Sequence, residues 1–171
     1  MGIDSKIEQL TRAMLGHAMR HELEDLAVLV GEAGDEMAAR AIGLCVFASG
    51  YVAVDVCERW PTQADLREIA KSASNSATKL DLHESEIYEY LSRVALGPEK
   101  LDDVFAMPKA GMLPLLVTAN LLATFRPRDK HWWEYLDQIW DAAETAEHTS
   151  LTVLPALTLR ARKQSTSQND A

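Results

Sequence analysis

The chain contains little glycine, proline and cysteine, and each scarcity excludes a class of structure. Eight glycines and six prolines in 171 residues leave little room for the turns of a β architecture. The two cysteines, Cys45 and Cys57, are 12 positions apart, about 18 Å along one continuous helix and too far for a disulfide. Two reduced thiols are typical of a cytoplasmic protein, and we expect that compartment.

Long hydrophobic runs are also missing. The longest uncharged stretches are Ala41–Val54 and Ala110–Phe125, of 14 and 16 residues. Both fall short of the roughly 20 apolar residues that a membrane-spanning helix needs. Residues 1–14 show no apolar run behind a basic start, so they do not resemble a signal peptide. The sequence therefore predicts no membrane segment.

Positive charge is in deficit, with 17 Lys and Arg against 26 Asp and Glu, a net charge of -9 and a pI near 5.0. This balance argues against a general nucleic-acid binder. The P-loop, the G-x-S-x-G elbow, the G-x-G-x-x-G turn and paired C-x-x-C motifs are absent. Hydrophobic residues at 47% and charged residues at 25% exclude a wholly disordered chain. Local motifs thus give no support to an enzyme or to a cofactor.

What is present is helical periodicity punctuated by capping and stop residues. We expect an all-α fold, a single-domain bundle of about six to seven helices over residues 1–160, with a disordered tail over 161–171. The predicted long helices cover about 5–31, 36–59, 63–73, 82–96, 109–125 and 129–148, with a short segment at 98–105 and an arm at 151–159. Ser5 and Glu8 have capping-box spacing, and Pro114 is expected to kink its helix.

Two of these helices, 36–59 and 109–125, are apolar nearly all round. A helix without a polar face belongs in the centre of a bundle, so we place both there. The positions expected to be most buried are eight residues of these two helices and the last one: Ile42, Cys45, Val46, Val52, Leu115, Leu116, Leu122 and Leu136.

The densest group of possible metal ligands is His17, His21 and Asp25. On one continuous helix, a spacing of four places all three on one face. Two imidazoles at i and i+4 can share a divalent metal, and a carboxylate one turn later can join or orient them. The alternative is a polar seam in which His21 pairs with Asp25. No Glu-x-x-His pair is present, which favours the seam.

Aromatic residues concentrate on the last predicted helix. Trp132 follows the buried periodicity there, and Trp133 lies about 100° away from it, so the two cannot share a groove. We expect Trp133 to be a subunit contact, since tryptophan is enriched at interfaces. Trp140 and Tyr51 are further candidates for an interface or a ligand pocket.

These observations favour a non-enzymatic helical bundle that acts through protein association, most simply as a homodimer. One alternative is a bundle that binds a metal or small ligand, such as a metal-dependent hydrolase built on His17, His21 and Asp25. Another is an effector-sensing regulatory domain with an apolar pocket near Tyr51 and Trp140.

Overall fold

A computed structural model describes residues 2–75, 80–96 and 112–146 of the chain. Helices account for 81% of these residues, and no strand occurs among them. The helices are α1 (Ser5–Met19), α2 (Leu23–Ala33), α3 (Asp35–Cys57), α4 (Gln63–Ser74), α5 (Glu84–Leu96), α7 (Leu113–Phe125) and α8 (Trp132–Ala146). The all-α prediction is confirmed. The predicted segments at 98–105, 151–159 and 161–171 lie outside the described residues.

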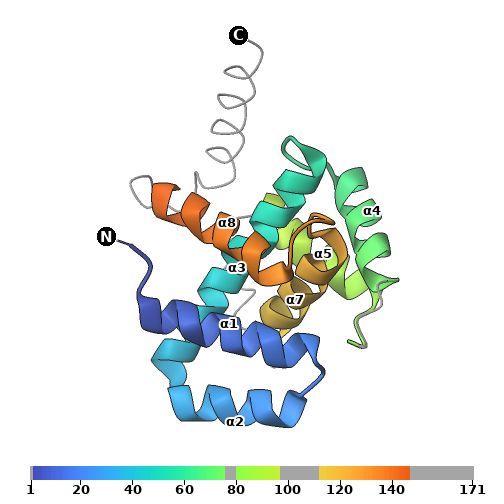
Figure 1. The fold of residues 1–171 in the computed structure, drawn as a ribbon. Coiled ribbons are helices and arrows are strands. Elements are labelled where there is room, and N and C mark those ends of the chain that lie inside the picture. Colours follow the sequence, from blue (N-terminus) through green and yellow to red (C-terminus); the bar gives the residue numbers. More distant parts are fainter. Residues whose placement is uncertain (1, 76–79, 97–111, 147–171) are drawn as a thin grey trace.

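Helix α3 runs through the centre of the bundle and packs on all six other described helices (Figure 1). Its most extensive partner is α7, as expected for the two helices without a polar face. The Thr118 hydroxyl of α7 donates a 2.8 Å hydrogen bond to the backbone carbonyl of Cys45 in α3. Both groups are buried, so this bond fixes the register of the two central helices.

Seven of the eight predicted core positions are buried, and Leu116 is the exception. Leu115 is fully buried, whereas Leu116 is only half-buried. Leu116 lies on the same side of α7 as Leu113 and Ala123, which are also half-buried. This helix therefore has a less covered side that its uniformly apolar sequence does not reveal.

The expected kink at Pro114 is wrong. Helix α7 begins at Leu113, which places Pro114 in its first turn. Proline lacks a backbone N–H, and the first turn of a helix is where that group has no intrahelical acceptor. Pro114 therefore starts the helix instead of bending it.

The first helix is not continuous to residue 31, contrary to the prediction. Helix α1 begins after Asp4, whose side chain caps it in place of Ser5, and it ends at Met19. His21 takes a left-handed conformation with φ of 60°, and α2 starts at Leu23. The chain turns back at this point, so that α2 lies beside α1 (Figure 1).

By length and composition, α3 is also the one helix among the described residues that could cross a membrane, with a mean hydropathy of 1.6 over its apolar window. Within the bundle, 61% of that window is buried. Its apolar residues are therefore mostly covered by neighbouring helices.

Candidate functional site

The break between α1 and α2 separates the three residues of the predicted metal row. His17 is in the last turn of α1, His21 is in the connection, and Asp25 is in the first turn of α2. The ligand atoms that come together are those of His17, Glu22 and Asp25, all within 4.8 Å of one another. His21 is exposed and is not part of this group. Glu22 could not be identified from the sequence pattern, because a continuous helix would point it away from His17.

The negative charge of this cluster already has a cationic partner. Glu22 Oε2 lies 2.7 Å from His17 Nδ1 and accepts a 2.9 Å hydrogen bond from Arg20 Nε. These bonds, with Arg20 first and His17 second, lower the pKa of Glu22 below its ordinary value. A metal ion would have to compete with Arg20 for this carboxylate. The arrangement ties the two ends of the α1–α2 connection together.

Of the three aromatic candidates, only Trp133 is at the surface. Trp140 and Tyr51 are 4% and 7% exposed, whereas Trp133 is 44% exposed. The Trp133 ring stacks on His131 with a centroid distance of 4.2 Å and an interplanar angle of 7°. The Trp132 ring packs nearly perpendicular to it, with the two ring centroids 5.8 Å apart. Trp133 is therefore an exposed aromatic side chain held by its neighbours.

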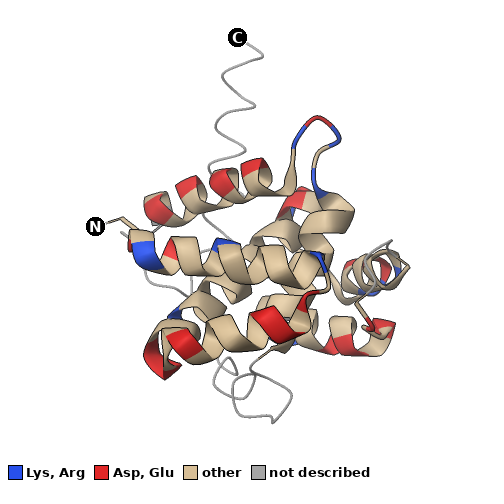
Figure 2. Ribbon diagram, turned by 60° about the horizontal axis from the view of Figure 1, so that its bottom comes forward, with Lys and Arg blue, Asp and Glu red and all other residues tan. Residues whose placement is uncertain are grey.

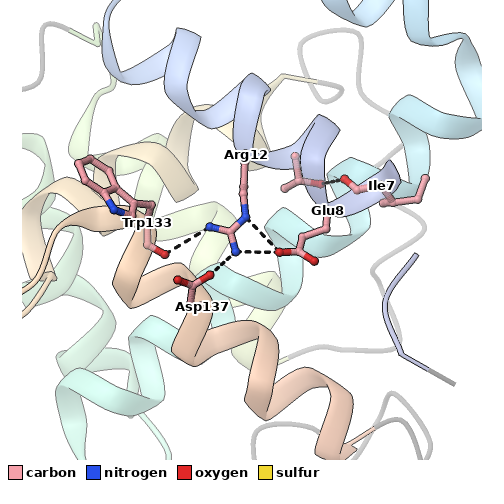
Figure 3. A network of polar contacts seen from close by, with 6 residues as sticks. Ile7, Glu8, Arg12, Trp133 and Asp137 are labelled. Atoms are coloured by element: carbon pink, nitrogen blue, oxygen red, sulfur yellow. Dashed lines mark hydrogen bonds and ion pairs between the residues drawn. The ribbon is translucent and has the colours of Figure 1, made fainter. Parts of the chain in front are cut away.

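Arg12 of α1 anchors the beginning of α8 (Figure 3). Its guanidinium donates to the Trp133 carbonyl at 3.4 Å, to Glu8 at 2.8 Å, and to Asp137 of α8. Burial acts to lower the pKa of Arg12, but the hydrogen bonds to Glu8 and Asp137 outweigh it and raise the pKa. Spacing alone could have identified the Glu8–Arg12 pair, although not the contacts with α8.

A second polar network joins α8 to α3. The Tyr135 hydroxyl donates to Asp55 at 2.7 Å, and the Gln138 amide donates to the Tyr51 hydroxyl at 3.0 Å. Lys130 Nζ reaches the Gln138 carbonyl oxygen at 3.0 Å. The rings of Tyr51 and Tyr135 also meet edge to face, 6.4 Å apart. Tyr51 and Asp55 of α3 therefore both contribute to the contact between α3 and α8.

Two further polar groups, the Trp140 indole nitrogen and the Cys45 thiol, are buried in the core. Trp140 Nε1 has no hydrogen-bond partner among the described residues. Cys45 is fully buried in α3, and burial raises the pKa of its thiol. A thiol in that environment stays protonated at neutral pH and is a poor nucleophile. Neither group forms a reactive centre by itself.

No family model matches the chain, and neither a curated protein nor a solved structure matches it.

Proposed function

We propose that this protein is a non-enzymatic association module that forms a homodimer through the surface around Trp133 at the start of α8. The observation that carries the proposal is an indole that is 44% exposed although two neighbouring rings contact it and its backbone is held by Arg12. His131 stacks on the indole, the Trp132 ring packs nearly perpendicular to it, and Arg12 bonds the backbone carbonyl.

A side chain held in this way loses little conformational freedom when it is buried by a partner. Tryptophan is also among the residues that contribute most to binding energy when it fills the centre of an interface. The exposed indole of Trp133 thus combines a large apolar area with a low ordering cost. These are the properties of an interface anchor.

The charges around Trp133 favour a second copy as the partner. The loop before α8 carries exposed Arg126 and Arg128, and the first turn of α8 carries exposed Glu134 (Figure 2). Both signs of charge therefore flank the indole. In a two-fold symmetric dimer, the arginines of one copy can face the carboxylate at the start of α8 in the other copy.

The test is the oligomeric state of the full chain, measured by light scattering on a sizing column across a range of concentrations. The wild-type chain should be dimeric in the micromolar range, and Trp133→Ser should shift it to monomer. Trp60→Ser is the matched control, because Trp60 is 38% exposed and lies outside α8. Circular dichroism verifies that both variants keep their helical content. A monomeric wild type, or a Trp133→Ser variant that dimerises like the control, would contradict the proposal.

A further inference from the structure

An exposed histidine is stacked on the indole that the proposed dimer would bury. The ring centroids of His131 and Trp133 are 4.2 Å apart, and the two rings are nearly parallel, at 7°. Both side chains are exposed. A second copy that covers Trp133 therefore also covers or lies beside the imidazole of His131. Histidine is the side chain whose charge ordinarily changes between about pH 5 and 8, so the charge of this surface depends on pH.

The loop that carries His131 is already basic. Between α7 and α8 lie Arg126, Arg128 and Lys130, against one acid, Asp129. The side chains of Arg126 and Lys130 bond carbonyl oxygens, which are neutral. These bonds therefore leave the positive charge of the loop uncancelled, and protonation of His131 adds to it.

The carboxylates on the neighbouring helices offset only part of this charge. Glu134, in the first turn of α8, accepts a 2.7 Å hydrogen bond from the backbone N–H of His131. On the side of α1, Arg12 donates to the Trp133 carbonyl, and two further carboxylates bond Arg12 itself (Figure 3). Glu134 is thus the acid that is bonded to His131 among the described residues.

Association makes a positive charge on His131 less favourable. In the proposed dimer, the arginines of one copy face Glu134 of the other, so this carboxylate is shared with the partner's cations. The partner also displaces water from the imidazole, and desolvation disfavours the charged form. The stacking of the imidazole on the indole occurs within one chain, so it contributes to monomer and dimer alike. The neutral form of His131 is therefore the form that associates more tightly.

We infer that His131 makes association pH-dependent, an inference that rests on the dimer proposed above: the dimer forms with neutral imidazoles and weakens when they are protonated. Its stability is fully present near about pH 8 and is lost as the pH falls through the range in which histidine takes up a proton. The whole chain has a net charge of -9 and a pI near 5.0, so acidification reduces the general repulsion between two copies. Weakening at low pH is therefore opposite to the effect expected from net charge.

Analytical ultracentrifugation of the full chain at about pH 5.8 and about pH 8 measures the dissociation constant of the dimer. For the wild type, this constant should be at least about fivefold larger at the lower pH. In His131→Phe, which keeps an aromatic ring beside the indole but takes up no proton, it should not rise. His131→Gln, which lacks both the aromatic ring and the charge, should also show no rise. A wild-type constant that does not rise, or rises equally in both variants, would overturn the role of His131.

His83→Phe is the matched control. His83 is exposed at the start of α5, and its backbone N–H bonds the Glu86 carboxylate at 3.0 Å, as that of His131 bonds Glu134. This variant should keep the response of the wild type to pH. Circular dichroism at both pH values verifies that every chain keeps its helical content.

The two proposals fail in different ways. A wild type that is monomeric at about pH 8 would contradict the dimer and, with it, the role of His131. A dimer that is lost in Trp133→Ser but is equally tight at both pH values would overturn the role of His131 alone. A His83→Phe variant that loses the response to pH would also overturn it, because the sensitive histidine would then lie outside the Trp133 surface.

Discussion

The Tyr135 hydroxyl donates a 2.7 Å hydrogen bond to Asp55 Oδ2, and this bond links α8 to the end of the central helix. Tyr135 is fully buried. Removing a hydrogen bond to a charged group costs about 1.5–3 kcal/mol. We therefore expect Tyr135→Phe to lower the free energy of unfolding by about 1.5–3 kcal/mol in a urea titration.

Tyr88→Phe is the control for that substitution. Tyr88 is half-buried, and its ring faces the Arg67 guanidinium at 5.2 Å, an interaction that phenylalanine preserves. Its effect should stay below about 0.5 kcal/mol, the usual range for a substitution outside a buried network. If both variants lose the same stability, the Tyr135–Asp55 bond does not stabilise the fold.

Adjacent leucines of α7 should respond differently to truncation. Leu115 is fully buried, so Leu115→Ala should cost about 2–5 kcal/mol. Leu116 is half-buried, and Leu116→Ala should cost about 1–2 kcal/mol, because less apolar area is lost. Denaturant titrations of both variants measure the difference. An equal or reversed order would mean that α7 is rotated from the orientation described above.

The left-handed conformation of His21 makes glycine the better residue at that position. A residue with a side chain pays about 1–2 kcal/mol of strain at a φ of 60°, and glycine avoids this strain. Part of the stability gained in this way is lost, because glycine is more flexible in the unfolded chain. We expect His21→Gly to be about 1 kcal/mol more stable than His21→Ala, as measured by chemical denaturation. Comparison with alanine removes the contribution of the imidazole itself. Equal stabilities would show that the turn relaxes when the side chain is replaced.

Zinc should leave the melting temperature of the wild-type chain unchanged, because Arg20 already bonds the Glu22 carboxylate near His17. Thermal unfolding with and without excess Zn²⁺ measures this, since a metal that binds the folded state raises the midpoint. His17→Ala is the control. A rise in the wild type that is lost in His17→Ala would establish a metal centre at the α1–α2 connection.

Asp65 should contribute to the acid sensitivity of the fold. Two hydrogen bonds from Arg59, followed by bonds from Thr62, lower the pKa of Asp65 to about 2 from an ordinary 3.8. Its stabilising effect is therefore fully present above pH 4 and is lost as the pH falls toward 2. Asp65→Asn should be less stable at pH 7, and its stability should change less than that of the wild type between pH 4 and 2. Parallel pH profiles would contradict this contribution.

Helix boundaries set by neighbouring residues could be predicted from the sequence. The start of α4 is an example, since Thr62 and Asp65 form the capping box that their spacing indicates. The end of α1 could not be predicted in this way, because no glycine or proline marks it. A helix that continued past Met19 would carry Leu26 beyond the core, whereas the turn at His21 allows Leu26 to be fully buried. Tertiary packing decides that boundary.

The candidate sites also combine features set by neighbouring residues with features set by tertiary packing. The exposed position of Trp133 could be predicted from its angle to Trp132, which is a local property. The contact between Arg12 and Asp137 joins residues 125 positions apart, and nothing in the sequence near either residue indicates it. The predicted grouping of His17, His21 and Asp25 assumed one continuous helix, and the structure separates His21 from the other two. Glu22 lies beside His17 and Asp25 because of the turn at His21, and only the packed structure shows that turn.

The pairing of α3 with α7 has a consequence for the newly synthesised protein. Thr118 bonds the Cys45 carbonyl across a sequence separation of 73 residues, so α3 leaves the ribosome well before its main partner exists. At about 5–20 residues per second, the delay is on the order of 4–15 seconds. During that interval the largely apolar 23-residue α3 lacks the helix on which it packs most extensively. The folding of α3 into the centre of the bundle is therefore completed only after α7 has been synthesised.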